Sequence, residues 1–339
     1  MKNKAKTIAR FLIFLGIGIF FIWLSMRDLT HAQKKDIISS FRNANYAWIV
    51  LAIFLGVLSH YLRSVRWKML IEPMGYKPRT YNVFFAVFIG YIANLALPRL
   101  GEVSRCGILT RYEKIPFNKS FGTVIAERTI DMIIFLVLFF TTLILQSSRL
   151  YAYVQTYIYD RLEAKLNYSI DFTGYLTYAV LLLSFLFLLV LILMWKRIKR
   201  SALFLKLKDL ILGFLEGIKS VYKVRNPFLF GFYSIAIWFL YLLMAYLVFF
   251  SLPLTSSLGL EAGLGVLIFG SIGIMLVQGG LGIYPAIVAE TLVLYSIPHT
   301  TGLAMGWLIW SSQTITIIVL GTLSLILLPV FNKSADVTD

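Results

Sequence analysis

Long apolar runs are the feature that most limits how this chain can fold. A stretch of about 20 apolar residues forms a membrane-spanning helix, because a helix satisfies its backbone hydrogen bonds within lipid. Only 14% of the 339 residues are charged and 59% are hydrophobic, whereas roughly a quarter of a soluble domain is charged. The sequence therefore predicts an all-α polytopic membrane protein whose residues 1–339 form a single transmembrane domain. Spanning helices are predicted at about 8–26, 46–65, 120–146, 175–195, 228–250 and 302–328.

The first of these runs follows four basic residues within residues 1–10. A basic start and an apolar run are typical of a signal peptide, but no small-residue cleavage site follows Leu24. We therefore expect a retained first helix in a cell (inner or plasma) membrane, with the N-terminus on the cytoplasmic side.

Two further apolar stretches are too short or too broken to cross. One is 82–97; the other comprises 263–277 and 283–297, separated by Gln278-Gly279-Gly280-Leu281-Gly282. If both stretches enter and return, 24 basic residues face the cytoplasm and 7 face outside. A full crossing of 82–97 would move 14 basic residues to the outside, against the positive-inside rule. The count predicts two re-entrant segments that open to opposite faces.

The two broken stretches also suggest an internal repeat. Leu97-Pro98-Arg99-Leu100-Gly101-Glu102 has a counterpart 181 residues later, in Gln278–Ile283. This divides the chain into a first half at 8–146 and a second half at 175–330, with a basic, amphipathic cytoplasmic segment at 196–226. Interrupted helices at corresponding places in two opposed halves indicate a transporter site near the bilayer midplane.

Charged residues gather around the first break. Arg99, Glu102 and Arg105 follow the break, and Glu127, Arg128 and Asp131 lie early in the next apolar run. Charges at membrane depth are costly unless paired or hydrated, and they usually mark function; the alternative is a salt bridge that joins two segments. We expect Arg128 and Asp131 to pair at i, i+3. Since Glu127, Arg128 and Asp131 carry a net charge of −1, a further cation is expected nearby, either Arg99 or Arg105.

The second break carries fewer polar groups. Gln278 and Glu290 are candidate binding residues, and Glu290 either carries a proton, binds an amine or pairs with a basic residue. At the end of the second helix, Arg63 and Arg66 are expected to snorkel to lipid headgroups beside Trp67, with a lipid-phosphate contact as the alternative. The candidate hinges are Pro98, Gly101, Gly279, Gly280 and Gly282.

These motifs together resemble the lysylphosphatidylglycerol synthase transmembrane-region family, flippase-like proteins related to the lipid-translocating half of the multiple peptide resistance factors. The resemblance covers about 8–330 and rests on P-x-x-G-E-x-x-R at 98–105, E-R-x-x-D at 127–131, Gly280-Leu281-Gly282 with Glu290, and Arg63-x-x-Arg66-Trp67. Here Gln278 replaces a proline usual in the family, and Tyr284-Pro285 precedes Glu290.

The resemblance implies movement of a polar-headed phospholipid or lipid-linked molecule between leaflets, with membrane lipids as partners. It does not imply lysyl transfer, which belongs to a separate cytosolic domain in the synthases. The alternatives are an intramembrane enzyme acting on lipid headgroups through Glu102, Glu127 and Asp131, or an accessory membrane subunit.

The remaining chemistry argues against other classes of protein. The only cysteine is Cys106 and the three histidines are far apart, so no disulfide, metal or cofactor is expected. The net charge of +16 fits loops beside anionic lipid rather than nucleic-acid binding. We expect no enzymatic activity, because no catalytic arrangement of residues is present.

Overall fold

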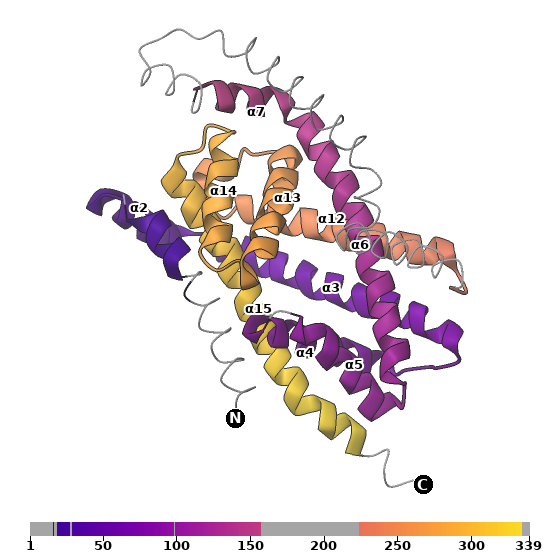
Figure 1. Cartoon of the computed structure of the whole chain (residues 1–339). Coiled ribbons are helices and arrows are strands. Elements are labelled where there is room, and N and C mark those ends of the chain that lie inside the picture. The colour runs from indigo at the N-terminus through magenta and orange to yellow at the C-terminus, as the bar shows by residue number, and fades with distance from the viewer. Residues whose placement is uncertain (1–15, 17–18, 28, 98, 157–223, 334–339) are drawn as a thin grey trace, which may run out of the picture.

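A computed structural model describes residues 16, 19–27, 29–97, 99–156 and 224–333 of the chain, and every regular element within them is helical (Figure 1). This confirms the all-α, polytopic membrane fold. The α-helices are α2 (His31–Asn43), α3 (Tyr46–Ile71), α4 (Thr80–Ala96), α5 (Leu100–Glu113), α6 (Phe117–Leu145), α7 (Ser147–Val154), α12 (Pro227–Phe249), α13 (Leu260–Leu276), α14 (Ile283–Val293) and α15 (His299–Lys333). The 3₁₀ turns are η1 (Glu72–Met74), η3 (Pro253–Thr255) and η4 (Gln278–Gly280).

Four described helices, α3, α6, α12 and α15, are long and apolar enough to cross a membrane. They coincide with four of the six predicted spans. The predicted span 175–195 lies outside the described residues, as do most of 8–26 and of the basic segment 196–226. The protein is therefore an integral membrane protein with α4, α13 and α14 as shorter apolar helices among its spans.

The long helices α3 and α12 pack side by side in antiparallel directions. The amide of Asn45, just before α3, donates to the carbonyl oxygen of Ser251, just after α12, at 2.9 Å. At the other ends of the two helices, Leu70 and Phe230 share one buried apolar cluster. This pair forms a layer against which the two broken stretches and the helices α6 and α15 are arranged.

The two breaks begin with the same kind of turn. α4 covers Thr80–Ala96 and α13 covers Leu260–Leu276, so each has 17 residues and their bounds differ by 180 positions. Each helix ends at an extended residue, Leu97 or Val277, which accepts a hydrogen bond from the amide three positions on. The third residue of each turn is left-handed, with φ of 64° at Arg99 and 67° at Gly279. The structural repeat is therefore real, but its register at the breaks is 180 residues and not the predicted 181.

The one-residue error has a local cause. The sequence comparison aligned the two Leu-Gly pairs, whereas the turns align Arg99 with Gly279. The first turn leads directly into α5 at Leu100, whereas Leu281 and Gly282 separate the second turn from α14, so the Leu-Gly pairs fall at different points of the two structures.

The two broken stretches open toward opposite ends of the bundle (Figure 1). The first residues of α4 contact the last residues of α15, where Asn332 Nδ2 donates to Asn82 Oδ1 at 2.8 Å. The first residues of α13 contact the end of α6, where Gln146 Nε2 donates to the Glu261 carbonyl at 3.1 Å. The breaks therefore approach each other from opposite ends, as an inverted repeat requires.

Candidate functional site

The two breaks meet at a cavity of about 520 Å³, here called the central cavity. Trp310 Nε1 of α15 donates a 2.7 Å hydrogen bond to the Gly279 carbonyl, which fixes the second break. The first half of the repeat contributes the charged walls, and the second half contributes mainly apolar and amide-bearing walls. The lining of the central cavity includes Tyr91, Arg99, Glu102, Arg128, Trp310 and Gln313.

Arg99 is the least satisfied of these charges. Its φ of 64° is the left-handed conformation that non-glycine residues avoid, at a cost of about 1–2 kcal/mol. Its side chain is exposed, lines the central cavity and has no ion-pair partner among the described residues. Pro98, predicted as a hinge beside it, lies outside the described residues.

Behind the cavity wall lies a buried set of charges, here called the ionic cluster: Arg63, Arg66, Arg105, Glu127 and Asp131. Glu127 is fully buried, and its oxygens lie 2.6 Å from Arg63 Nε, 3.4 Å from Arg66 Nη2 and 2.8 Å from Arg105 Nη2. Asp131 lies 2.7 Å from Arg66 and 3.3 Å from Arg63. Three guanidinium groups face two carboxylates, so the ionic cluster carries a formal charge of +1.

The predicted position of Arg63, Arg66 and Trp67 at the lipid interface is wrong. Arg66 and Trp67 have 0% exposure and Arg63 has 9%. Trp67 Nε1 donates to Thr123 Oγ1 at 2.9 Å, and the Arg105 guanidinium lies 4.5 Å from its ring centroid. The carboxylates of α6 offer both arginines partners inside the bundle, so the side chains turn inward instead of snorkelling.

The predicted pair between Arg128 and Asp131 is also wrong. Arg128 Nη2 donates to Glu102 Oε1 of α5 at 2.5 Å. Glu127 and Asp131, four residues apart on α6, both bond to Arg63 and Arg66 of α3, which offsets their mutual repulsion. Of the two candidates for the additional cation near these acids, Arg105 joins the ionic cluster and Arg99 faces the central cavity.

Tyr91 connects the ionic cluster to the central cavity, a role that no sequence pattern indicated. Its hydroxyl accepts a 2.9 Å hydrogen bond from Arg63 Nη1 and lies 3.2 Å from His60 Nδ1. Since Tyr91 also lines the cavity, any ligand there rests against a wall held by the ionic cluster. An aromatic residue inside an apolar helix is too common a pattern for sequence reasoning to single it out.

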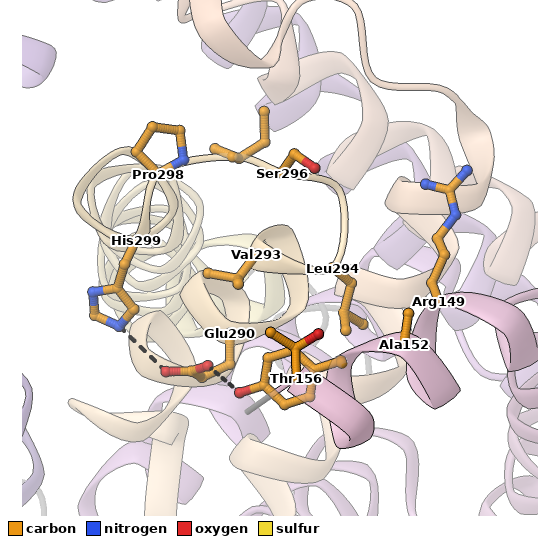
Figure 2. Close-up of a pocket in the computed structure, with 11 residues that line it drawn as sticks. Arg149, Ala152, Thr156, Glu290, Val293, Leu294, Ser296, Pro298 and His299 are labelled. Carbon is orange, nitrogen blue, oxygen red and sulfur yellow. Dashed lines mark hydrogen bonds and ion pairs between the residues drawn. The ribbon is translucent and has the colours of Figure 1, made fainter. Parts of the chain in front are cut away.

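Glu290 lies elsewhere, in a separate pocket of about 870 Å³ between α7, α14 and the start of α15. Figure 2 shows its carboxylate facing His299, whose Nε2 lies at 3.4 Å. The Tyr153 hydroxyl also donates to this carboxylate, at 2.7 Å. Glu290 does not line the central cavity, so its predicted place in one site with Arg99 and Arg105 is wrong. It points from α14 toward α7 and α15, two turns beyond the break. The side chain of Gln278 lies outside what the structure describes.

The predicted hinge glycines differ in what they do structurally. Gly279, Gly280 and Gly282 have φ of 67°, 69° and 75°, which favour glycine. Gly101 lies within α5 and serves close packing instead: a Cβ atom there would lie 2.1 Å from the Gly90 carbonyl oxygen. Across the described residues, no group of three histidine, cysteine or acidic side chains is placed to hold a metal ion.

Comparison with known proteins places this geometry in a family. Residues 8–321 match the family described as the lysylphosphatidylglycerol synthase TM region. The chain belongs to this family. The part of the chain that matches the lysylphosphatidylglycerol synthase TM region includes both breaks, the central cavity and the ionic cluster.

Two curated relatives share part of the chain. The UPF0104 membrane protein MJ1595 of Methanocaldococcus jannaschii is 33% identical over 136 residues, 39% of each chain. The glycosyltransferase AglD of Haloferax volcanii is 24% identical over 131 residues, 38% of this chain and 21% of that protein. The matched regions thus cover well under half of either relative. No solved structure matches the chain.

Proposed function

We propose that the protein is a flippase, which moves a polar-headed phospholipid or lipid-linked molecule between leaflets without changing it chemically. The observation that carries this proposal is the central cavity itself, which lies where two opposite-facing broken helices meet. Inverted-repeat transporters bind their substrates at such a place.

The charges around the cavity favour an anionic headgroup. Arg99, Arg128 and Glu102 sum to +1 at the lining, and the ionic cluster behind Tyr91 adds a further +1. Forked guanidinium donors suit phosphate oxygens. In the transport cycle, Arg99 binds the phosphate and Arg105 reinforces its field from behind, while Glu102 faces an amine or a sugar hydroxyl.

The rim of the cavity favours a ligand that stays partly in lipid. Leu100, Met275 and Leu276 beside the two breaks are exposed large apolar residues. In a bilayer such side chains contact acyl chains, so a headgroup reaches the cavity laterally while its tails remain in the membrane. The predicted distribution of 24 basic residues on one side and 7 on the other favours a cell membrane with the first break open to the cytoplasm and the N-terminus on the same side.

A second candidate is an intramembrane enzyme that modifies lipid headgroups. It is favoured by the relative named as a glycosyltransferase and by Glu102, whose buried Oε2 lacks a hydrogen-bond partner within the described structure.

One experiment separates the two candidates. The purified protein is reconstituted in liposomes that contain a fluorescent phosphatidylglycerol or a fluorescent lipid-linked sugar phosphate. A quencher that reaches only the outer leaflet is added, and the loss of lipid fluorescence is followed with time. We expect faster leaflet exchange with unchanged lipid mass, and at least a fivefold slower rate for Arg99→Gln than for the charge-matched control Lys114→Gln. A mass change in the lipid would favour the enzyme, and unaltered exchange of every lipid tested would overturn the flippase.

A further inference from the structure

Another concave surface lies apart from the central cavity and from the pocket of Glu290, between the first and second halves of the protein. This surface, here called the α5–α15 groove, has a volume of about 550 Å³. It is lined by Ile89 of α4, by Ser104, Gly107, Ile108 and Arg111 of α5, and by Leu325 near the end of α15, among others. None of these residues lines the central cavity.

The groove is charged at one end and apolar along its length. Ser104, Gly107, Ile108 and Arg111 follow the i, i+3, i+4, i+7 spacing of a single helix face. Arg111 lies in the last turn of α5, near the polar residues Glu113 and Lys114 that end the helix. Ile89, Ile108 and Leu325 line the rest. A cation at the end of a bundle with an apolar channel leading inward matches the layout of a phospholipid in a bilayer.

Arg111 is available to a ligand. Its side chain is exposed and its guanidinium lies 5.3 Å from the ring centroid of Tyr112. Within the described part of the chain it has no carboxylate partner. The nearby carboxylate of Glu113 is instead engaged by Asn82 Nδ2 at 2.6 Å and by the Arg79 amide at 3.0 Å.

The opposite wall also includes a carbonyl group without its usual helical donor. Pro329 lies inside α15 and has no backbone N–H, so the carbonyl group of Leu325 lacks the helical donor four residues on. Both residues line the groove.

We propose that the α5–α15 groove binds one anionic phospholipid of the surrounding bilayer, with the phosphate on Arg111 and an acyl chain along Ile108, Ile89 and Leu325. The bound lipid joins α5 of the first half to α15 of the second. This site goes beyond the proposed function, because it lies outside the central cavity and does not depend on transport.

Gly107 makes the proposal testable without altering charge. A Cβ atom at Gly107 would meet nothing within 4 Å, so Gly107→Leu adds bulk to the groove without a clash at its base and improves helix propensity. Gly122 of α6 is equally open and lies outside the groove, so Gly122→Leu is a matched control. Arg111→Gln removes the cation, with Lys114→Gln as its control.

The experiment is native mass spectrometry of the full-length, delipidated protein with dioleoylphosphatidylglycerol or with dioleoylglycerol, which lacks the phosphate. We expect the wild-type protein, Gly122→Leu and Lys114→Gln to retain phosphatidylglycerol in preference to dioleoylglycerol. The fraction of protein that carries it should fall at least twofold in Gly107→Leu and in Arg111→Gln. Combining Gly107→Leu with Arg99→Gln should lower retention further, because the second change acts on the central cavity.

Three results would overturn the proposal. One is retention by Gly107→Leu and Arg111→Gln at the wild-type level. Another is equal retention of dioleoylglycerol and phosphatidylglycerol. The third is a loss in Gly107→Leu alone, which would show an apolar groove without a phosphate contact. Failure of leaflet exchange in liposomes would leave this binding result unaffected.

Discussion

Arg99 and Gly279 hold the same position in two matching turns, yet only one of them is a glycine. The turn requires φ near +65° at that position, and Arg99 adopts it at 64° despite its side chain. A residue kept in a costly conformation at a cavity wall is a functional candidate. The strain at Arg99 thus supports its proposed contact with the headgroup.

Exchanging the residue types at these positions should separate stability from function. In Arg99→Gly, relief of the left-handed strain stabilises the folded state by about 1–2 kcal/mol. The greater conformational freedom of glycine in the unfolded chain offsets about 0.4–1 kcal/mol of this gain. We therefore expect Arg99→Gly to be at least as stable as wild type in thermal unfolding, and to bind anionic lipid less tightly. Gly279→Ala should lose about 1–2 kcal/mol. A clear loss of stability in Arg99→Gly would contradict the strain argument.

The partner of Arg128 is a second test at this scale. A double-mutant cycle of Arg128→Gln with Glu102→Gln should show a coupling of about 0.2–1 kcal/mol, the range for partly exposed pairs. The cycle of Arg128→Gln with Asp131→Asn should show no coupling by the same unfolding measurement. Coupling to Asp131 alone would restore the i, i+3 pair that the sequence predicted.

At the scale of elements, the ionic cluster connects α3, α5 and α6 through the carboxylate of Glu127. Glu127→Gln leaves Arg63 and Arg66 with Asp131 and takes away the carboxylate that Arg105 contacts, and breaking a buried pair costs about 3–5 kcal/mol. We expect a corresponding loss in thermal or denaturant unfolding, and no such loss for Glu72→Gln on the exposed turn after α3. Equal stability of the two variants would show that the cluster does not hold these helices together.

Hydropathy and charge were enough to predict the four spanning helices within the described residues, and were not enough to find their contacts. The apolar runs predicted α3, α6, α12 and α15, but the predicted end of α3 at 65 falls short of Ile71. Charges normally end a span, so Arg66 and Trp67 were assigned to the interface. Their partners on α6 lie more than 50 residues away, beyond any local pattern. The charge sum of Glu127, Arg128 and Asp131 did predict a missing cation, and Arg105 supplies it.

At the scale of the whole molecule, the two broken stretches lie in opposite orientations, and this arrangement fixes which ends of the bundle share a side of the membrane. Lys114 follows α5 at one end, and Ser257 lies in the turn before α13 at the other. In a background with Cys106→Ser, we expect Lys114→Cys to resist an impermeant thiol reagent in intact cells and Ser257→Cys to react. Labelling of both positions would contradict the proposed topology, and labelling of Lys114→Cys alone would indicate the reverse orientation. The inverted arrangement could be predicted from basic-residue counts, whereas its register required the backbone angles.

The ionic cluster also has a consequence for how the protein is made. Arg63 pairs with a carboxylate 64 residues further along the chain, which at 5–20 residues per second leaves the ribosome between about 3 and 13 s later. During that interval the end of α3 carries two arginines and no partner acid. We therefore expect this end of the nascent helix to stay among lipid headgroups until α6 is synthesised.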